Sequence, residues 1–333
     1  MSLIGTLNIN RTQILNHLDR AIRDSFIRVF SDCRHRNTAP QEPDFIAGLV
    51  VYAVPDIYYS LRPIFARDNA LWSVASVFCH LKPQVAFNPN LGLPCCELGD
   101  ILFVHQHKNI AGENSYAALL LQAKIVSGNK YTIPPPYSQL ILYTAWPAFT
   151  YYKSPPLSGS RDVNPKSVHS GAAYLLLLDF RITPLRIRGR NSPAQIGLPD
   201  NILVPFTSLT EELYGLLCFK AGRVFKDRNI TGYGWSKVVW DLLERGVQKA
   251  FNRRKGGFIK RPSLSGGPIS TIDGYSFFGC PDNACFDVFR EILEDDFFAT
   301  IYPPPPGTSG ERGNFSDGEY GTSIVVFETE EQG

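Results

Sequence analysis

The sequence has few charged residues, no long apolar run and too few cysteines for a disulfide framework. Charged residues make up 19% of the 333 residues and apolar residues 44%, which excludes a disordered chain, a collagen or a coiled coil. The longest apolar stretch, Ala172 to Leu178, is far shorter than the roughly 20 residues of a membrane-spanning helix. The seven cysteines are an odd number, so reduced thiols are the expected state.

Several signatures of enzymes and of secreted proteins are also missing. The glycine pairs at 256–257 and 266–267 lack the lysine and hydroxyl residue of a nucleotide-binding P-loop, so ATP hydrolysis is not expected. No Gly-x-Ser-x-Gly nucleophile motif occurs. The first residues, Met1 to Thr6, lack the charged and apolar regions of a signal peptide, so a cytoplasmic protein without a membrane partner is expected.

Charge is distributed unevenly along the chain. The net charge is +2, but the segment from Glu291 to the C-terminus holds ten acidic residues and one basic residue, Arg312. The remainder carries 32 basic and 21 acidic side chains, a net charge of +11. This basic body permits an anionic partner.

The first half of the chain alternates between helical and strand patterns. Apolar residues recur every four positions between Ile14 and Phe30, which predicts a helix over residues 11–33. The segment Asp44 to Phe65 predicts a buried helix that can break at Pro55. The elements expected next are strands at Val74–Leu81 with Val85–Phe87, Leu98–His105 and Tyr116–Val126, a helix at Ser138–Trp146, and a strand at Tyr174–Phe180.

The second half is expected to be an extension and a tail. Helical patterns at Leu209–Phe225 and Trp235–Phe251 indicate a mainly helical extension over residues 191–302. Residues 303–333 form an acidic tail rich in proline and glycine, with a short strand at Ser323–Phe327. Apart from that strand, the segment after Pro306 is expected to be mobile and unnecessary for folding.

Polar side chains interrupt two successive apolar strands. Gln122 and Lys124 lie in the same strand, and because side chains alternate along a strand they share one face. A buried amide and a buried ammonium need partners, and Asp100 on the preceding strand is the expected one. An aspartate, an amide oxygen and a lysine are the parts of a magnesium-dependent phosphodiesterase site, because the oxygens suit a hard cation and the lysine neutralises phosphate charge.

These residues resemble the PD-(D/E)XK nuclease superfamily, in the Gln-x-Lys form of Mrr-like restriction and defence nucleases. The resemblance rests on Gly-Asp-Ile-Leu at 99–102, Gln-Ala-Lys at 122–124 and the element order over residues 10–182. It implies an α/β protein with a restriction-endonuclease-like core, a mixed central sheet flanked by helices, in residues 1–190. It assigns metal binding to Asp100 and Gln122 and catalysis to these residues with Lys124, and the implied cofactor is Mg²⁺ or Mn²⁺.

A carboxylate on a helix often completes the site in this family. Glu42, at the start of the second helix, is the best match for a catalytic metal ligand, with Asp44 behind it. Glutamine in place of glutamate removes one metal-binding charge, which the helix carboxylate or Glu97 can replace. Gln139 on the following helix could also approach the site, although core packing of that helix explains the segment as well. The alternative to a site is an edge strand with Gln122 and Lys124 facing outward.

Other candidate metal ligands carry less weight. His105 and His107 share a strand face, but no third ligand stands at metal spacing, which favours a polar pair. Cysteines at 95, 96, 280 and 285 could form a zinc site only by coming together from distant segments.

The function expected from these residues is hydrolysis of DNA phosphodiester bonds by a metal-dependent endonuclease, in antiphage defence or restriction. The expected partners are DNA, contacted through Arg253, Arg254 and Lys255, a separate ATPase or sensor protein, and a second copy in a homodimer. Two alternatives remain open: a non-catalytic interaction subunit that uses the fold as a scaffold, and a nuclease that acts on RNA.

Overall fold

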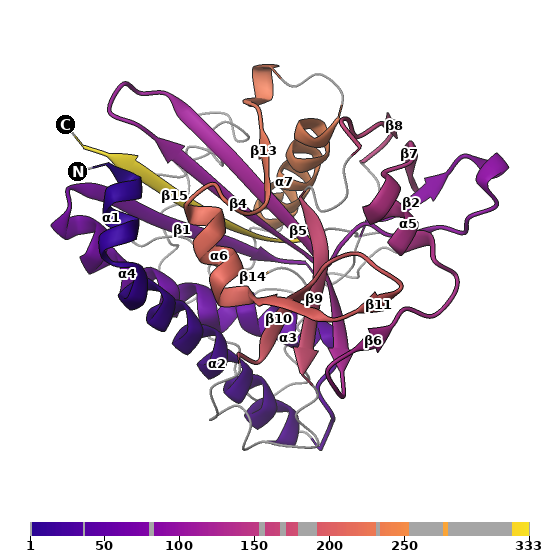
Figure 1. Cartoon of the computed structure of the whole chain (residues 1–333), viewed down its shortest axis with the longest axis horizontal. Coiled ribbons are helices and arrows are strands. Elements are labelled where there is room, and N and C mark those ends of the chain that lie inside the picture. Colours follow the sequence, from indigo (N-terminus) through magenta and orange to yellow (C-terminus); the bar gives the residue numbers. More distant parts are fainter. Residues whose placement is uncertain are drawn as a thin grey trace.

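The computed structural model describes residues 2–35, 37–79, 83–152, 157–166, 171–178, 192–230, 234–252, 276–278 and 322–332. Within them, a nine-stranded mixed sheet forms the centre of the protein (Figure 1). From edge to edge the strands are β12 (Pro205–Ser208), β10 (Ala194–Gly197), β9 (Ala172–Leu178), β5 (Asn114–Val126), β4 (Ile101–Lys108), β15 (Ser323–Glu331), β1 (Ala70–Phe78) and β14 (Ser276–Phe278), while β13 (Arg223–Phe225) pairs with β5. The β5–β9 and β4–β15 pairs are parallel and the others are antiparallel.

Helices cover both faces of this sheet, so the protein is α/β. One face carries α1 (Leu3–Ile9), α2 (Arg11–His35), α3 (Glu42–Gly48), the π-helical segment η1 (Leu49–Ala53), α4 (Val54–Arg67) and α6 (Leu209–Leu217). The other face carries α5 (Ser138–Ala145) and α7 (Trp235–Asn252). Two short 3-10 turns, η2 (Pro89–Leu91) and η4 (Arg228–Ile230), lie in the connections.

Two small sheets lie beside the central one. The larger has the order β3 (Cys96–Glu97), β2 (Gln84–Phe87), β7 (Phe149–Tyr152) and β8 (Ser160–Arg161), and the smaller pairs β6 (Tyr131–Thr132) with β11 (Ile202–Leu203). The expected strand Val85–Phe87 is therefore present but belongs to a separate sheet from β1.

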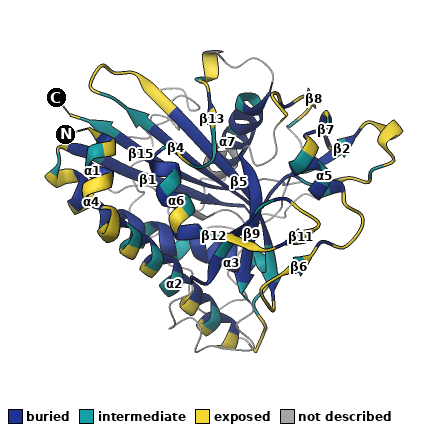
Figure 2. Ribbon diagram, viewed as in Figure 1, coloured by how far each residue is buried: buried dark blue, intermediate teal, exposed yellow. Residues whose placement is uncertain are grey.

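The period of two along the strands creates a core on each face of the central sheet. In β4, Phe103 belongs to the core that includes the buried faces of α2 and α4, whereas its neighbours Leu102 and Val104 belong to the core that includes α5 and α7. Figure 2 shows the result, with the central strands buried and the exposed residues concentrated on outer helix faces and loop tips. Both sides of the sheet are covered, so its strands are almost continuously apolar.

The N-terminal helices agree well with the sequence patterns. The apolar side chains Ile14, Leu18, Ile22 and Phe26 are all fully buried in α2. The second helix is not broken at Pro55: the chain stays helical from Glu42 to Arg67, and the π-helical segment η1 lies immediately before the turn that holds this proline. The segment Glu42–Arg67 is long and apolar enough to cross a membrane, but 67% of its most apolar window is buried inside the protein, as in a core helix.

The helix expected at Leu209–Phe225 is shorter than predicted. It ends at Leu217, and the chain turns through Phe219 and Gly222, both with positive φ, into strand β13. A Cβ atom on Gly222 would lie 2.8 Å from the Ala118 carbonyl oxygen, so the turn requires glycine on steric as well as conformational grounds.

The segment 191–302, expected as a mainly helical extension, contributes strands to the central sheet as well as helices in its described part. It supplies α6 and α7, but also strands β10, β12, β13 and β14 of the central sheet. Helical periodicity identified the two helices and missed the strands, because these strands have only three or four residues each.

The C-terminal strand is the largest correction to the expectations. Strand β15 is longer than the expected Ser323–Phe327 and lies in the middle of the sheet, between β4 and β1. Ile324, Val325 and Val326 are fully buried. The expectation of a mobile chain after Pro306 excepted a short docked strand, and the structure corrects the length and the place of that strand. Residues 303–321 lie outside the described residues.

Candidate active site

The end of β5 has an edge that no described strand covers. Strand β4 pairs with β5 only as far as Leu121, whereas β9 pairs with the opposite side of β5 to its end. Two carboxylates bind the backbone N–H groups along this edge. Asp100 Oδ2 accepts a hydrogen bond from the Ala123 N–H at 2.5 Å, and Glu42 Oε1 accepts one from the Ile125 N–H at 3.3 Å. Two of the predicted site residues thus accept hydrogen bonds from N–H groups that are neighbours along the same edge of β5.

Asp100 occupies the bend immediately before β4 and is only 2% exposed. Its backbone N–H donates to the Leu121 carbonyl at 2.8 Å, which continues the β4–β5 pairing beyond the last ladder pair, Ile101 with Leu121. The same register places Asp100 opposite Gln122. Residues directly opposite in a sheet share a face, as the sequence predicted for these two.

Gln122 is buried, 1% exposed, inside a group of hydrogen bonds. Its Oε1 accepts from Gln139 Nε2 at 2.6 Å, and its Nε2 donates to Glu97 Oε2 at 3.4 Å. Gln139 Nε2 also donates to the Glu97 carbonyl at 3.0 Å. Helix α5 therefore brings Gln139 to the site, and Gln122 does not face solvent as it would on an outward edge strand.

Lys124 pairs with the predicted helix carboxylate. Its Nζ lies 3.9 Å from Glu42 Oε2, and the two side chains are 22% and 28% exposed. Asp44, the second helix candidate, has another role: its Oδ2 accepts from the Gln41 backbone N–H at 2.8 Å in a capping box at the start of α3. Glu42 thus contacts the motif, and Asp44 caps the helix that carries Glu42.

The surrounding tyrosine and cysteine side chains stay protonated. Burial, and then Glu42, raises the pKa of Tyr131. Burial, with smaller contributions from Cys95 and Glu97, raises the pKa of the Cys96 thiol to about 12. These neighbours can donate hydrogen bonds but cannot act as bases near neutral pH.

The donor atoms suit a hard divalent cation. Carboxylate and amide oxygens are the ligands that Mg²⁺ and Mn²⁺ prefer. No group of three or more His, Cys, Asp and Glu side chains able to hold a metal occurs in the described part of the chain. A cation would therefore depend on the amide oxygen of Gln122 together with Asp100 and a second carboxylate.

Tyr174 is a neighbour that the sequence patterns missed. It pairs directly with Gln122 on the other side of β5 and is fully buried. Its hydroxyl has no hydrogen-bond partner among the described residues. The signal was present in the sequence, because Tyr174 is the one hydroxyl in an otherwise apolar strand.

The histidine pair has a structural arrangement. His105 Nε2 and His107 Nδ1 both lie 3.0 Å from Thr329 Oγ1, and His105 Nδ1 lies 3.3 Å from the Leu216 carbonyl. This agrees with the expected polar pair. The four cysteines considered as zinc ligands form no site among the described residues. Cys95 and Cys96 are free thiols, and Cys280 and Cys285 lie outside the described residues.

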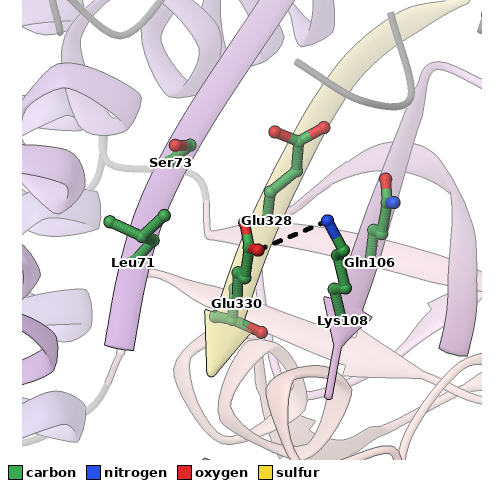
Figure 3. A pocket seen from close by; sticks show the side chains of 7 residues that line it. Leu71, Ser73, Gln106, Lys108, Glu328 and Glu330 are labelled. Carbon is green, nitrogen blue, oxygen red and sulfur yellow. Dashed lines mark ion pairs between the residues drawn. The ribbon is translucent and has the colours of Figure 1, made fainter. Parts of the chain in front are cut away.

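Two hollows in the described part of the protein are lined by residues other than those of the candidate site. A cavity of about 10 Å³, room for one water molecule, lies beside the ion pair of Lys108 and Glu330. Figure 3 shows the side chains that line it. The cavity is lined by Leu71, Ser73, Gln106, Lys108, Glu328, Thr329 and Glu330. A shallower hollow of about 350 Å³ lies on α5 and is lined by Tyr137, Leu140, Ile141, Thr144, Pro199, Asp200 and Asn201. Neither includes a predicted site residue. Arg253, Arg254 and Lys255, the expected DNA contacts, lie outside the described residues.

Comparison with known proteins adds no relative: the chain matches no family model, no curated protein and no solved structure.

Proposed function

We propose that the protein is a metal-dependent nuclease that hydrolyses DNA, with its active site at the end of β5. The observation that carries the proposal is the hydrogen bond from the Ala123 N–H, between Gln122 and Lys124, to the Asp100 carboxylate. This hydrogen bond joins the two parts of the predicted motif: Asp100, immediately before β4, and the Gln-Ala-Lys sequence in β5.

The topology around the site supports a PD-(D/E)XK-like core. The aspartate precedes one strand, the Gln-x-Lys sequence ends its antiparallel neighbour, and that neighbour then pairs in parallel with β9. Helices cover both faces of this mixed sheet. This arrangement is the one that the resemblance implies for a restriction-endonuclease-like fold.

The residues have distinct roles in this proposal. Asp100, Gln122 and Glu42 supply oxygens to Mg²⁺ or Mn²⁺, with Glu97 available through its contact to Gln122. The bound metal supplies Lewis-acid activation of the phosphate and of a water molecule. Lys124, held near Glu42, neutralises the negative charge that develops on the phosphate.

The substrate and the biological setting follow from chemistry and analogy. A body with a net charge of +11 outside the acidic C-terminal segment favours a polyanionic substrate such as DNA. A role in antiphage defence or restriction beside an ATPase or sensor, in the cytoplasm and as a homodimer, extends the analogy with Mrr-like nucleases.

A second candidate is a non-catalytic scaffold. It is favoured by the short Gln139–Gln122 hydrogen bond of 2.6 Å, in which the amide oxygen proposed as a metal ligand is already engaged by a protein donor. An amide pair packed in this way also fits a structural core. Divalent-metal binding separates the candidates, because a scaffold needs none.

The test is cleavage by the purified full chain of plasmid, linear and single-stranded DNA and of RNA, each with Mg²⁺, Mn²⁺ or EDTA. We expect cleavage of DNA with either metal and none with EDTA. Asp100→Asn keeps an oxygen for the Ala123 N–H but removes the charge, so Mn²⁺ affinity and cleavage should both fall by about 10-fold or more. The matched control is Asp32→Asn, a buried aspartate in α2 that accepts a hydrogen bond from the Tyr52 hydroxyl and should affect stability alone. Mn²⁺ binding equal in wild type and Asp100→Asn would reject this site.

A further inference from the structure

The short segment that presents Asp100 is held by hydrogen bonds on three successive carbonyl groups. The Leu98 carbonyl accepts from the Tyr143 hydroxyl of α5 at 2.7 Å. The Gly99 carbonyl accepts from Thr322 Oγ1 at 3.3 Å, and the Asp100 carbonyl accepts from the Ser323 N–H at 3.1 Å. Two of the three donors belong to the C-terminal end of the chain, where β15 begins.

The same segment has no room to shift toward β5. A Cβ atom on Gly99 would lie 2.6 Å from Leu120 Cδ1 and 3.2 Å from the Tyr143 hydroxyl, so the backbone is in close contact with the neighbouring strand and with α5. Its position is therefore limited on one side by packing. On the side of β15 it is fixed by the hydrogen bonds of Thr322 and Ser323.

Thr322 and Ser323 are well placed to hold a backbone segment. Both are fully buried. Ser323 is fixed in turn, because its Oγ accepts from the Cys79 N–H at 3.1 Å and donates to the Cys79 carbonyl at 3.3 Å. The start of β15 is thus anchored to β1 on one side and to the Asp100 segment on the other.

We propose that Thr322 is a positioning residue for Asp100, so that the C-terminal strand completes the metal site. Thr322 does not touch the metal or the substrate. Its hydroxyl fixes the Gly99 carbonyl and with it the direction in which the Asp100 carboxylate points toward Gln122 and Ala123. This inference rests on the proposed function, since Asp100 must be a metal ligand for its placement to matter.

The positioning role links the metal site to the placement of the C-terminal strand during folding. Asp100 and Thr322 are 222 positions apart in the chain, and β15 is the last described strand. A chain that has not yet placed β15 lacks two of the three hydrogen bonds on the Asp100 segment. The nuclease would therefore acquire its metal site only when the C-terminal strand is in place.

The experiment compares Thr322→Val with Thr329→Val in the full chain. Both remove a buried hydroxyl, one from the residue immediately before β15 and one from within the strand, about 23 Å farther along, where Thr329 contacts His105 and His107. Mn²⁺ affinity is measured by electron paramagnetic resonance of free Mn²⁺, which does not depend on cleavage, and unfolding midpoints are measured in parallel. Thr322→Val should weaken Mn²⁺ binding by about 10-fold, the usual effect of losing a residue that orients a metal ligand. Thr329→Val should lower the unfolding midpoint without changing Mn²⁺ affinity.

Two further variants keep the test decisive. Thr322→Ser retains the hydroxyl and should restore Mn²⁺ affinity, and Thr322→Ala replaces the valine variant if the latter does not fold. Equal Mn²⁺ affinity in wild type, Thr322→Ala and Thr322→Val would overturn the positioning role while leaving the proposed function in place. If the wild type itself binds no Mn²⁺ and cleaves no nucleic acid, the proposed function fails, and this inference fails with it.

Discussion

The carboxylate of Asp100 lies 2.5 Å from the backbone nitrogen of Ala123, across the point where β4 begins and the pairing of β5 with β4 ends. Here the Asp100 side chain accepts the hydrogen bond from the Ala123 N–H in place of a neighbouring strand. The Glu42 carboxylate does the same for Ile125, two residues farther along. Buried backbone N–H groups need acceptors, so the two acidic side chains have a structural role whether or not a metal binds. Function must therefore be tested with variants that keep the acceptor or that lie outside this edge.

The variant Lys124→Ala leaves both carboxylate acceptors in place. The Lys124–Glu42 pair spans 3.9 Å and both side chains are partly exposed, so its loss should change the free energy of unfolding by less than about 1 kcal/mol. Cleavage should fall by about 100-fold or more, because a cation near the phosphate is removed. Lys108→Ala is the control, since Lys108 pairs with Glu330 at 3.3 Å with similar exposure in another part of the sheet. A Lys124→Ala protein that cleaves DNA at the wild-type rate would contradict the assigned role.

A pair of tyrosines tests the hydrogen bonding around Gln122. Tyr174→Phe removes a buried hydroxyl that has no partner among the described residues, so stability should stay the same or rise by up to about 1 kcal/mol. Tyr143→Phe removes the donor to the Leu98 carbonyl and should cost about 1–2 kcal/mol. The measurement is the urea midpoint at unchanged m-value. A clear loss of stability in Tyr174→Phe would show that its hydroxyl has an essential partner, such as a bound water.

Local patterns predicted much of the site because its main residues are close in sequence. Asp100 lies immediately before β4 and Gln122 in the next strand, β5, which is antiparallel to β4, so the strand prediction was enough to place them opposite each other. Glu42 was found only through the family resemblance, since nothing in its own segment points to β5. Tyr174 was missed because one tyrosine in an apolar strand also fits ordinary core packing.

The arrangement of the sheet could not be predicted in the same way. Strand β15 pairs with β4 across more than 200 residues, and its sequence, five largely apolar residues followed by acidic ones, is equally consistent with an edge strand. The order of strands depends on such distant pairings, which periodicity does not encode. The short strands of residues 191–302 were missed for a different reason, because three or four residues are too few to show a period.

Stability should depend on pH through His105. Burial, and then His107, lowers the pKa of His105 from 6.5 to about 3, despite the hydrogen bond with the Leu216 carbonyl. The unfolded chain therefore binds a proton near pH 6.5 that the folded protein does not bind until about pH 3. The free energy of unfolding should be highest above pH 6.5 and fall as the pH is lowered, by at most about 1.4 kcal/mol per pH unit for this residue.

The measurement is urea unfolding between about pH 5 and pH 7, a range that lies above the titration of most carboxyl groups. His105→Gln should flatten the pH dependence in this range, although a smaller slope should persist because burial also lowers the pKa of His107. An unchanged slope in His105→Gln would show that His105 is not the group responsible.

Ending the chain before Ser323 should prevent folding. The truncation removes β15, which pairs with β1 on one side and β4 on the other, and therefore splits the central sheet into two parts. It also removes Ile324, Val325, Val326 and Phe327, whose side chains are at most 1% exposed. Burying each of these large side chains contributes about 1.5–3 kcal/mol, so their joint loss is comparable to the whole stability of a typical domain. The truncated protein should be insoluble or show no cooperative thermal transition by circular dichroism.

The control is a chain that ends at Glu331, which keeps all of β15 and should unfold cooperatively like the full chain. A soluble protein with a cooperative transition after truncation at Thr322 would mean that β4 and β1 can close the sheet without the C-terminal strand, and that β15 is an accessory to the fold.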